Sequence, residues 1–236
     1  MKSMFRTVVA AALLAGTAFT PALAQSAPGY VEPSNYDILN GATGYQSGDI
    51  MTHLSIIGVI PENRNSHVNV SGGPTVGNLN VSSGVSPEVD ASYFFTKNLS
   101  IQLIAATSRH TISARLPGLG VPGNQTLGST WVLPPTLTAQ WHFPQIGIIR
   151  PYVGVGITVA FFWGTSPSNN DALGLRTSVG PAFDAGFDVP LQGNWTANVD
   201  VKQMFLPTAA RLNHGSVHAM TNLDPTVVGF GVGYKF

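Results

Sequence analysis

Alternation with a period of two runs through most of this sequence, and it constrains the fold more than any other feature. Near the C-terminus, Val228, Phe230, Val232, Tyr234 and Phe236 fall on one face of an extended chain, and glycines and one lysine fall on the other. The pattern recurs at 195–206, 178–189, 151–163 and 131–143, and more weakly at 99–107, 87–96 and 49–60. Successive side chains of a strand point to opposite faces, so the pattern predicts eight β-strands.

The chain is poor in charge, with 11 basic and 11 acidic residues among 236, or 9%, where soluble domains carry about 25%. Lys2 and Arg6 precede an apolar run, and Ala22-Leu23-Ala24 fits the small-x-small rule for cleavage. Residues 1–24 are therefore predicted to be a secretory signal peptide, with a retained anchor helix as the alternative. Residues 25–47 are predicted to be an N-terminal periplasmic segment.

After residue 24, no stretch reaches the ~18 apolar residues that a membrane-spanning helix needs. An exported, apolar and charge-poor chain of this kind can cross a bilayer as a closed β-barrel, because a barrel pairs every backbone polar group internally. The prediction is an all-β, eight-stranded antiparallel transmembrane β-barrel over 48–236, without partner subunits. Short turns at 96–98, 144–147 and 192–194 alternate with long loops at about 61–86, 108–129, 164–176 and 207–224, which places both termini in the periplasm.

The aromatic residues test this prediction. Trp131 and Trp141 are ten residues apart on one face, a rise of about 33 Å, which strand tilt reduces to the ~25 Å height of the apolar band. A soluble β-sandwich, the alternative, predicts more charge on the other face. The outer aromatic belt is predicted to contain Trp131, Trp163 and Phe205, and the inner belt Trp141, Trp195, Phe95 and Tyr234.

Several stretches, taken in order, resemble the OmpW family of small outer-membrane proteins. They are Gly48-Asp49, Leu133-Pro134-Pro135-Thr136-Leu137-Thr138, Gln140-Trp141-His142-Phe143, Arg150-Pro151-Tyr152-Val153-Gly154-Val155-Gly156, 186–191, 198–202, Asp224-Pro225 and 231–236. The resemblance covers about residues 45–236. It implies a monomeric barrel in the bacterial outer membrane that lets small hydrophobic molecules pass and leave sideways through the wall. Tyr234 and Phe236 also match a C-terminal signal of the kind that the barrel assembly machinery reads.

Eight strands leave a lumen that side chains nearly fill, so an open water-filled pore is not expected. By parity, the inward positions near the outer end are apolar, and we expect them to form an entry funnel: Ile57, Val59, Ile104, Val132, Pro134 and Met204. The other inward positions are predicted to form a polar network: His53, Glu88, Asp90, His142, Arg150, Asp184, Asp188, Asp200, Lys202 and Lys235. Pro135 and Pro181 can weaken strand pairing and mark the expected lateral exit.

Other functions find little support in the residues. The net charge of zero argues against nucleic acid, and the absence of cysteine removes thiolate chemistry and Cys-bound zinc. Ser108 with His110, and His214 with Ser216 and His218, fall in predicted loops, so no enzyme, metal or cofactor is expected. The predicted partners are outer-membrane lipid, small hydrophobic solutes and the assembly machinery. The alternative function is a structural or receptor barrel whose loops 61–86 and 207–224 bind a partner or phage.

Overall fold

The computed structural model describes residues 44–236, except 63–65, 71–72, 168–172, 176 and 213–216. The predicted signal peptide and residues 25–43 of the predicted periplasmic segment lie outside the described residues. Where the chain is described, no helix is long and apolar enough to cross a membrane.

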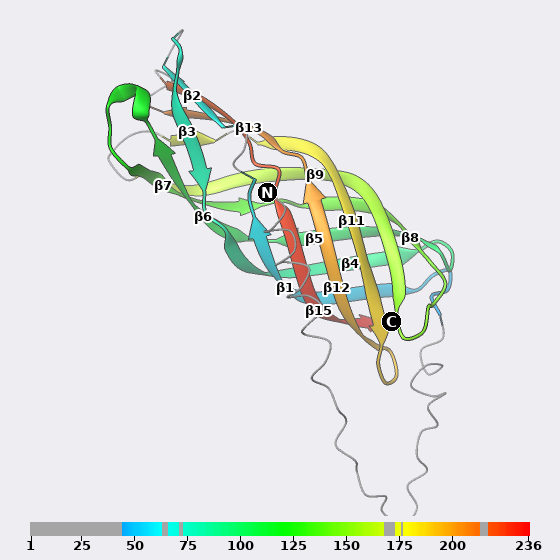
Figure 1. Ribbon diagram of the computed structural model, residues 1–236. Helices are drawn as coiled ribbons and strands as arrows, with labels where there is room; N and C mark the ends of the chain where they lie inside the picture. The colour runs from blue at the N-terminus through cyan, green and yellow to red at the C-terminus, as the bar shows by residue number, and fades with distance from the viewer. Residues whose placement is uncertain (1–43, 63–65, 71–72, 168–172, 176, 213–216) are drawn as a thin grey trace, which may run out of the picture. The chain divides into compact units, whose positions relative to one another are not determined.

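Eight antiparallel strands close into a barrel (Figure 1). Each strand pairs with its neighbours in chain order, and the last pairs with the first, with Leu54 opposite Val232. This arrangement confirms the predicted eight-stranded antiparallel barrel. The strands are β1 (Ile50–Ile60), β4 (Gly84–Phe94), β5 (Leu99–Ala106), β8 (Thr136–His142), β9 (Arg150–Pro167), β11 (Ser178–Pro190), β12 (Trp195–Met204) and β15 (Thr226–Lys235).

The two ends of the barrel differ. At one, called the turn end below, the strands are joined by the predicted short turns, and Gly147 and Gly193 have φ angles of 60° and 66°, a conformation that favours glycine. Past the other, called the extended end, further strands continue the wall (Figure 1). These are β2 (His67–Val70), β3 (Thr75–Val81), β6 (Ser108–Arg115), β7 (Asn124–Leu133), β10 (Leu173–Leu175), β13 (Pro207–Leu212) and β14 (Val217–Asn222), with the 3-10 turn η2 (Pro117–Leu119).

The prediction of loops at the extended end was therefore wrong for much of these stretches. The strands pair as hairpins, and β6 lies between β3 and β7. Val76, Leu79, Ile112 and Ala114 form a small apolar core of their own there. The glycine, asparagine and serine content suggested loops. Backbone hydrogen bonds between neighbouring segments, together with this apolar core, stabilise strands there instead.

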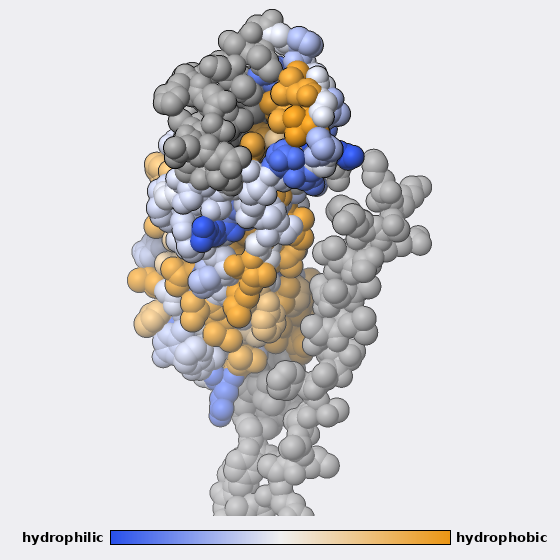
Figure 2. All heavy atoms as spheres, turned by 90° about the vertical axis from the view of Figure 1, so that its left-hand side faces the viewer, coloured by the Kyte–Doolittle hydropathy of each residue, from blue (hydrophilic) through white to orange (hydrophobic). Residues whose placement is uncertain are grey.

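Buried and exposed residues alternate along each barrel strand. The buried residues are mostly polar and the exposed ones mostly apolar, which is the reverse of the arrangement in a soluble protein. On β8, Thr138 and Gln140 point inward and are 1% exposed, whereas Leu137 and Trp141 point outward and are about half exposed, at 49% and 50%. Figure 2 shows apolar side chains gathered on the outer surface of the barrel. An apolar outer face of this extent requires a lipid environment rather than water.

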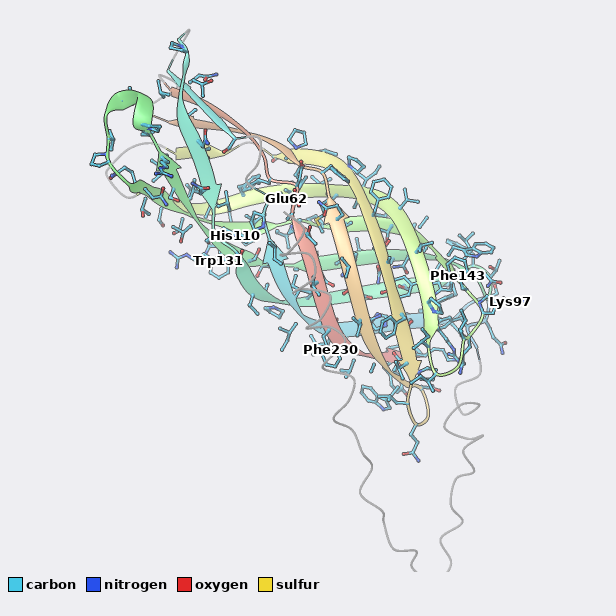
Figure 3. All side chains as sticks on the ribbon, in the orientation of Figure 1. Glu62, Lys97, His110, Trp131, Phe143 and Phe230 are labelled. Atoms are coloured by element: carbon cyan, nitrogen blue, oxygen red, sulfur yellow. The ribbon has the colours of Figure 1, made fainter. Side chains whose placement is uncertain are left out.

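The aromatic residues assigned to the two belts lie on the outer face. Trp131 pairs with Trp163 across β7 and β9, and the rings of Trp195 and Tyr234 are 5.0 Å apart. Figure 3 shows Trp131 and Phe143 at opposite ends of the wall. The exposed belt residues are Trp131, Trp163, Phe205, Trp141, Trp195 and Phe95, with Tyr234 half-buried.

The strand predicted at 131–143 is interrupted. It divides into β7 and β8 at Pro134 and Pro135, which have no N–H to give to a ladder. Both halves still pair with β9, with Leu133 opposite Phe161 and Thr136 opposite Thr158. The wall is therefore continuous on the β9 side of this break. At the C-terminus, Phe236 is exposed and its N–H donates to the carbonyl of Ile50; its role as an assembly signal stays a prediction.

Candidate functional site inside the barrel

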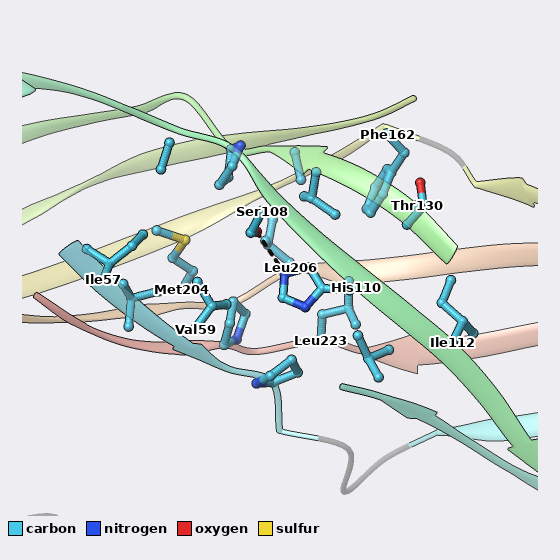
Figure 4. Close-up of a pocket in the computed structure, with 18 of the residues that line it drawn as sticks. Ile57, Val59, Ser108, His110, Ile112, Thr130, Phe162, Met204, Leu206 and Leu223 are labelled. Carbon is cyan, nitrogen blue, oxygen red and sulfur yellow. Dashed lines mark hydrogen bonds between the residues drawn. The ribbon is translucent and has the colours of Figure 1, made fainter. Parts of the chain in front are cut away.

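An apolar cavity lies inside the barrel towards its extended end (Figure 4). All the residues predicted to form a funnel line it: Ile57, Val59, Ile104, Val132, Pro134 and Met204. The empty space between the wall atoms is at most about 960 Å³, part of it open to solvent. A guest in this cavity must therefore be small.

The cavity wall is wider than the sequence predicted. In addition to Ile57 and Met204, the residues Phe162, Leu206 and Leu223 also line it. Phe162 and Leu206 hold inward positions of β9 and of the chain just after β12, so the same parity that placed Met204 could have found them. Leu223 could not be found in this way, because it lies in a stretch predicted as loop.

Below the cavity, towards the turn end, the lumen is filled by ion pairs. The Lys202 ammonium lies 2.6 Å from a Glu88 oxygen and also contacts Asp200. Nδ1 of His53 lies 2.8 Å from Asp90, and its Nε2 lies 3.3 Å from Asp188. All these residues are buried, and a buried charge needs a partner because removing it from water is costly.

Amide side chains extend the ion pairs of His53 into a wider network, which together with the ion pairs of Lys202 is called the polar floor below. Gln102 donates to Asp90 at 2.9 Å, and Gln140 donates to Gln102 at 2.7 Å and to Asp184 at 2.5 Å. Asn198 donates to Asp188 at 2.9 Å. The floor thus contains side chains from most of the barrel strands. An apolar solute that entered it would break these hydrogen bonds and has no polar group with which to replace them.

The other predicted network residues lie nearer the turn end. His142 is buried, with its Nε2 3.0 Å from the Ser100 hydroxyl, and Arg150 is buried and donates to Gln145 at 3.1 Å. Lys235 sits at the rim instead, half-buried, 3.4 Å from Asp49. Nine of the ten predicted network residues are therefore buried inside the barrel, and Lys235 is placed at its edge.

Tyr45, which precedes β1, closes the turn end, and no sequence pattern pointed to it. It is 5% exposed, its ring stacks on Phe94 at 4.2 Å, and its hydroxyl donates to Asp188 at 2.5 Å. The Arg150 guanidinium lies 5.4 Å from the ring centre. Burial, together with the Asp188 carboxylate, raises the pKa of the Tyr45 phenol well above its ordinary value, so the phenol stays protonated and remains a donor.

Glycines make room for the floor. A Cβ added at Gly154 would collide with a carboxylate oxygen of Asp184, and one added at Gly229 would collide with a carboxylate oxygen of Asp200. In so narrow a barrel, the inward glycines of β9 and β15 therefore provide the space that the acidic side chains fill.

The wall has a break in pairing between β4 and β5, called the seam below, which the sequence did not reveal. Glu88 stands opposite Ala106, and the next pair would be Pro87 with Thr107, but the β5 ladder ends there. The N–H of Phe94 points to β1 and that of Phe95 to β5. Backbone groups alternate in direction along a strand, so residue 87 faces β5, where proline has no N–H to donate.

A change of register accompanies the seam. Glu88 is seven positions after Val81, but their partners Ala106 and Ile112 are only six positions apart. One extra residue on the β3–β4 side is the signature of a bulge. The Ser86 hydroxyl, rather than a backbone N–H, contacts the carbonyl of Thr107.

A shallow depression on the lipid-facing side lies over the seam. Pro87, Val89, Ala105 and Thr107 contribute to it, with Leu54 and Leu133 at its edges. Glu88 and Ala106 line both this depression and the inner cavity. A single layer of residues therefore separates the cavity from the membrane at this point.

The two prolines proposed from sequence as the exit differ in their surroundings, and Pro135 lies beside a second gap, because the β5–β8 ladder ends at Ile104 and Thr136 and pairing resumes only at Ser108 and Val132. The Pro135 carbonyl accepts from the N–H of Val159 at 3.0 Å, next to the break between β7 and β8. Pro181 lies within β11, opposite Ile157 of β9, and its carbonyl accepts from Phe205 at 3.0 Å. Neither residue lines the cavity or the depression.

Ser108 and His110 are not in a loop, as predicted, but on β6, where both are buried in the cavity wall. His214 and Ser216 lie outside the described residues. Within the described part of the chain, no group of three or more His, Cys, Asp or Glu side chains is arranged to hold a metal ion.

Comparisons with known proteins agree with this architecture. The OmpW family model matches residues 46–236. The uncharacterized outer-membrane protein y4mB of Sinorhizobium fredii is 36% identical over 184 residues, covering 76% of each chain. Outer membrane protein W of Salmonella typhi is 33% identical over 177 residues, covering 70% of this chain and 80% of that protein. The crystal structure of OprG from Pseudomonas aeruginosa superposes with a TM-score of 0.74 at 26% identity, covering 82% of this chain and 98% of OprG.

Proposed function

This chain belongs to the OmpW family of non-enzymatic barrels in the bacterial outer membrane, and on that premise we propose that it passes small apolar molecules sideways into the membrane. The solute enters the apolar cavity from the extended end, which faces the outside, and leaves through the seam. The short turns then face the periplasm. The apolar cavity that ends on a closed polar floor is the observation that carries the proposal.

The floor sets the direction of travel. An apolar solute that moved straight down would have to separate the Lys202, Glu88 and Asp200 charges and break the hydrogen bonds of Gln140 without replacing them. Leaving buried charges and polar groups unpaired costs several kcal/mol per group, to order of magnitude. Tyr45 adds a second obstacle at the turn end. Movement sideways avoids both.

The seam is the opening in the wall on which the cavity and the outer depression converge. The β4–β5 ladder already lacks the hydrogen bond of Pro87 and ends before Thr107, so parting it there breaks few bonds. The depression outside and the cavity inside meet at Glu88 and Ala106. Pro135 and Pro181 remain the competing exits, because they too lack an N–H.

Solute uptake tests the proposal directly. The purified barrel is placed in vesicles whose outer leaflet is lipopolysaccharide, and entry of naphthalene is compared with that of naphthalene-2-sulfonate, which has the same ring system and a charge. We expect selective entry of naphthalene. Ile57→Asp and Met204→Asp put a carboxylate in the cavity and should abolish most of this entry, because an apolar guest would have to displace the water that solvates the carboxylate.

Two matched variants control for the substitutions. Met204→Leu keeps the cavity apolar, and Leu119→Asp adds a carboxylate at an exposed position of η2, outside the cavity. Both should retain naphthalene entry. Unchanged entry in Ile57→Asp and Met204→Asp barrels, shown to be folded by heat-shifted gel mobility, would refute passage through the cavity.

One observation favours the receptor alternative. The strands past the extended end have an apolar core of their own around Leu79 and Ile112, so they present a formed surface to a partner rather than loose loops. A folded barrel that admits neither naphthalene nor its sulfonate would favour this second function.

A further inference from the structure

Ser108 and His110 are two of the four polar or charged residues in a cavity wall that is otherwise apolar, the others being Glu88 and Thr130 (Figure 4). The Ser108 hydroxyl lies 2.7 Å from Nε2 of His110, and Nδ1 of the same ring lies 2.7 Å from the carbonyl of Ser82. Both side chains are buried, at 6% and 4% exposed. The pair is thus held rigidly among Ile57, Met204 and the other aliphatic residues around it.

The carbonyl of Ser82 fixes the direction of these hydrogen bonds. A carbonyl oxygen can only accept, so Nδ1 of His110 carries a proton and donates it to Ser82. In the neutral ring, Nε2 then accepts a hydrogen bond from the Ser108 hydroxyl. The Ser108 oxygen uses its one proton in that bond and keeps lone pairs with which it can accept from a molecule inside the cavity.

The other polar residues of the wall are engaged elsewhere. Glu88 is held by Lys202 of the floor at 2.6 Å. The Thr130 hydroxyl has a single proton to share between the carbonyls of Trp131 and Trp163, both at 3.3 Å. The 2.7 Å bond of Ser108 to His110 is shorter, so the Ser108 hydroxyl is the more firmly oriented of the two and the better placed to accept a hydrogen bond from a guest.

We propose that the Ser108–His110 pair is a binding subsite for the hydroxyl group of an otherwise apolar solute. This inference rests on the proposed function and names its substrate class: molecules with one hydrogen-bond donor on a hydrocarbon body. Such a donor loses its hydrogen bonds to water on entering an apolar cavity and regains one at Ser108, whereas a solute without a donor gains nothing there.

The position of the subsite fits a role in guiding solute to the exit. Ser108 directly follows Thr107, where the β5 ladder ends, and Thr107 lines the depression on the membrane side. A solute held by its hydroxyl at Ser108 therefore has its hydrocarbon part free to lie along the wall next to the seam.

The test compares two isomers, 2-naphthylmethanol and 2-methoxynaphthalene. They share composition and ring system, but the alcohol donates a hydrogen bond and the ether only accepts. Dissociation constants are measured by ligand-detected NMR with the full barrel in nanodiscs, after subtraction of binding to empty nanodiscs. We expect the alcohol to bind about tenfold more tightly, the worth of one hydrogen bond in a site shielded from water.

The decisive variant removes both members of the pair. Ser108→Ala alone leaves Nε2 of His110 free to accept from the alcohol, so the preference should persist there. Ser108→Ala combined with His110→Phe removes both side-chain acceptors of the subsite, while the phenyl ring fills the space of the imidazole over the Ser82 carbonyl, and it should equalise the two Kd values while the ether still binds. Ser113→Ala, on the same strand but outside the cavity wall, is the matched control and should keep the tenfold preference.

The outcomes separate this inference from the function it rests on. Equal binding of alcohol and ether to the unaltered barrel, or a preference that survives in the double variant, overturns the hydroxyl subsite and leaves passage of apolar molecules standing. Binding of neither isomer overturns both. Heat-shifted gel mobility shows in each case that the barrel is folded.

Discussion

At the scale of single residues, Lys202 decides whether the floor is stable. Its ammonium group contacts two buried carboxylates, Glu88 and Asp200, and no other lysine is described in the floor. Lys202→Met should lower the free energy of unfolding by about 3–5 kcal/mol, because it leaves both carboxylates buried without their partner. Urea unfolding in lipid vesicles, followed by tryptophan fluorescence, measures the change.

The same site offers a rescue that distinguishes charge from packing. Glu88→Gln and Asp200→Asn, added to Lys202→Met, remove the unpaired charges and should restore most of the lost stability, since a neutral network needs no counter-charge. A single Lys202→Met variant as stable as the unaltered protein would contradict the ion pairing in the floor.

Tyr45 makes a second residue-scale prediction, because its ring and its hydroxyl have different roles. Tyr45→Phe keeps the stack on Phe94 and loses only the hydrogen bond to Asp188, at a cost of about 1–3 kcal/mol in unfolding free energy. Tyr45→Ala also removes the ring from the turn end and should raise the ion conductance of the barrel in planar bilayers. Equal conductance for Tyr45→Ala and the unaltered protein would show that the turn end is closed by something else.

At the scale of strands, the seam between β4 and β5 makes the sharpest prediction. Pro87→Val supplies the N–H that the ladder lacks and should reduce naphthalene entry about fivefold, because one added hydrogen bond of ~1 kcal/mol must break before the wall opens. Pro181→Val and Pro135→Val are the matched controls and should leave entry unchanged. Reduced entry only in Pro181→Val or Pro135→Val would place the exit where the sequence first suggested it.

The elements also show what a sequence can reveal. Alternation with a period of two predicted the eight barrel strands, and parity alone assigned Ile57, Ile104 and Met204 to the cavity wall, because lipid outside and a narrow lumen inside impose opposite chemistry on neighbouring residues. Prediction from the alternating pattern failed past the extended end, where the strands are stabilised by pairing with one another and by a small local apolar core. Ser108 and His110 were misplaced for this reason.

Contacts between distant parts of the chain were beyond prediction. Tyr45 meets Asp188 across 143 residues, and the seam depends on how Pro87 is aligned with Thr107, which no local pattern records. Pro135 and Pro181 were equally good candidates by composition. Only the register of neighbouring strands separates a proline that interrupts pairing from one whose missing N–H is tolerated.

At the scale of the whole molecule, the barrel is apolar outside, polar at its floor and apolar again in its upper cavity. The outer face matches the membrane core, and the cavity continues this apolar character into the barrel. On the proposed route, the floor stops straight passage and small guests move from the cavity to lipid through the seam without entering water.

A reversible cross-link across the seam tests this central claim most directly. The chain has no cysteine, so Pro87→Cys with Thr107→Cys creates a single pair, and Val189→Cys with Ala197→Cys, opposite each other on β11 and β12, creates a matched pair away from it. Naphthalene entry is measured with each pair oxidised and then reduced. The account predicts that oxidation at the seam blocks entry, that reduction restores it to the lower level expected once Pro87→Cys supplies an N–H, and that oxidation of the control pair has no effect. Full entry through a barrel whose seam disulfide is complete would contradict it.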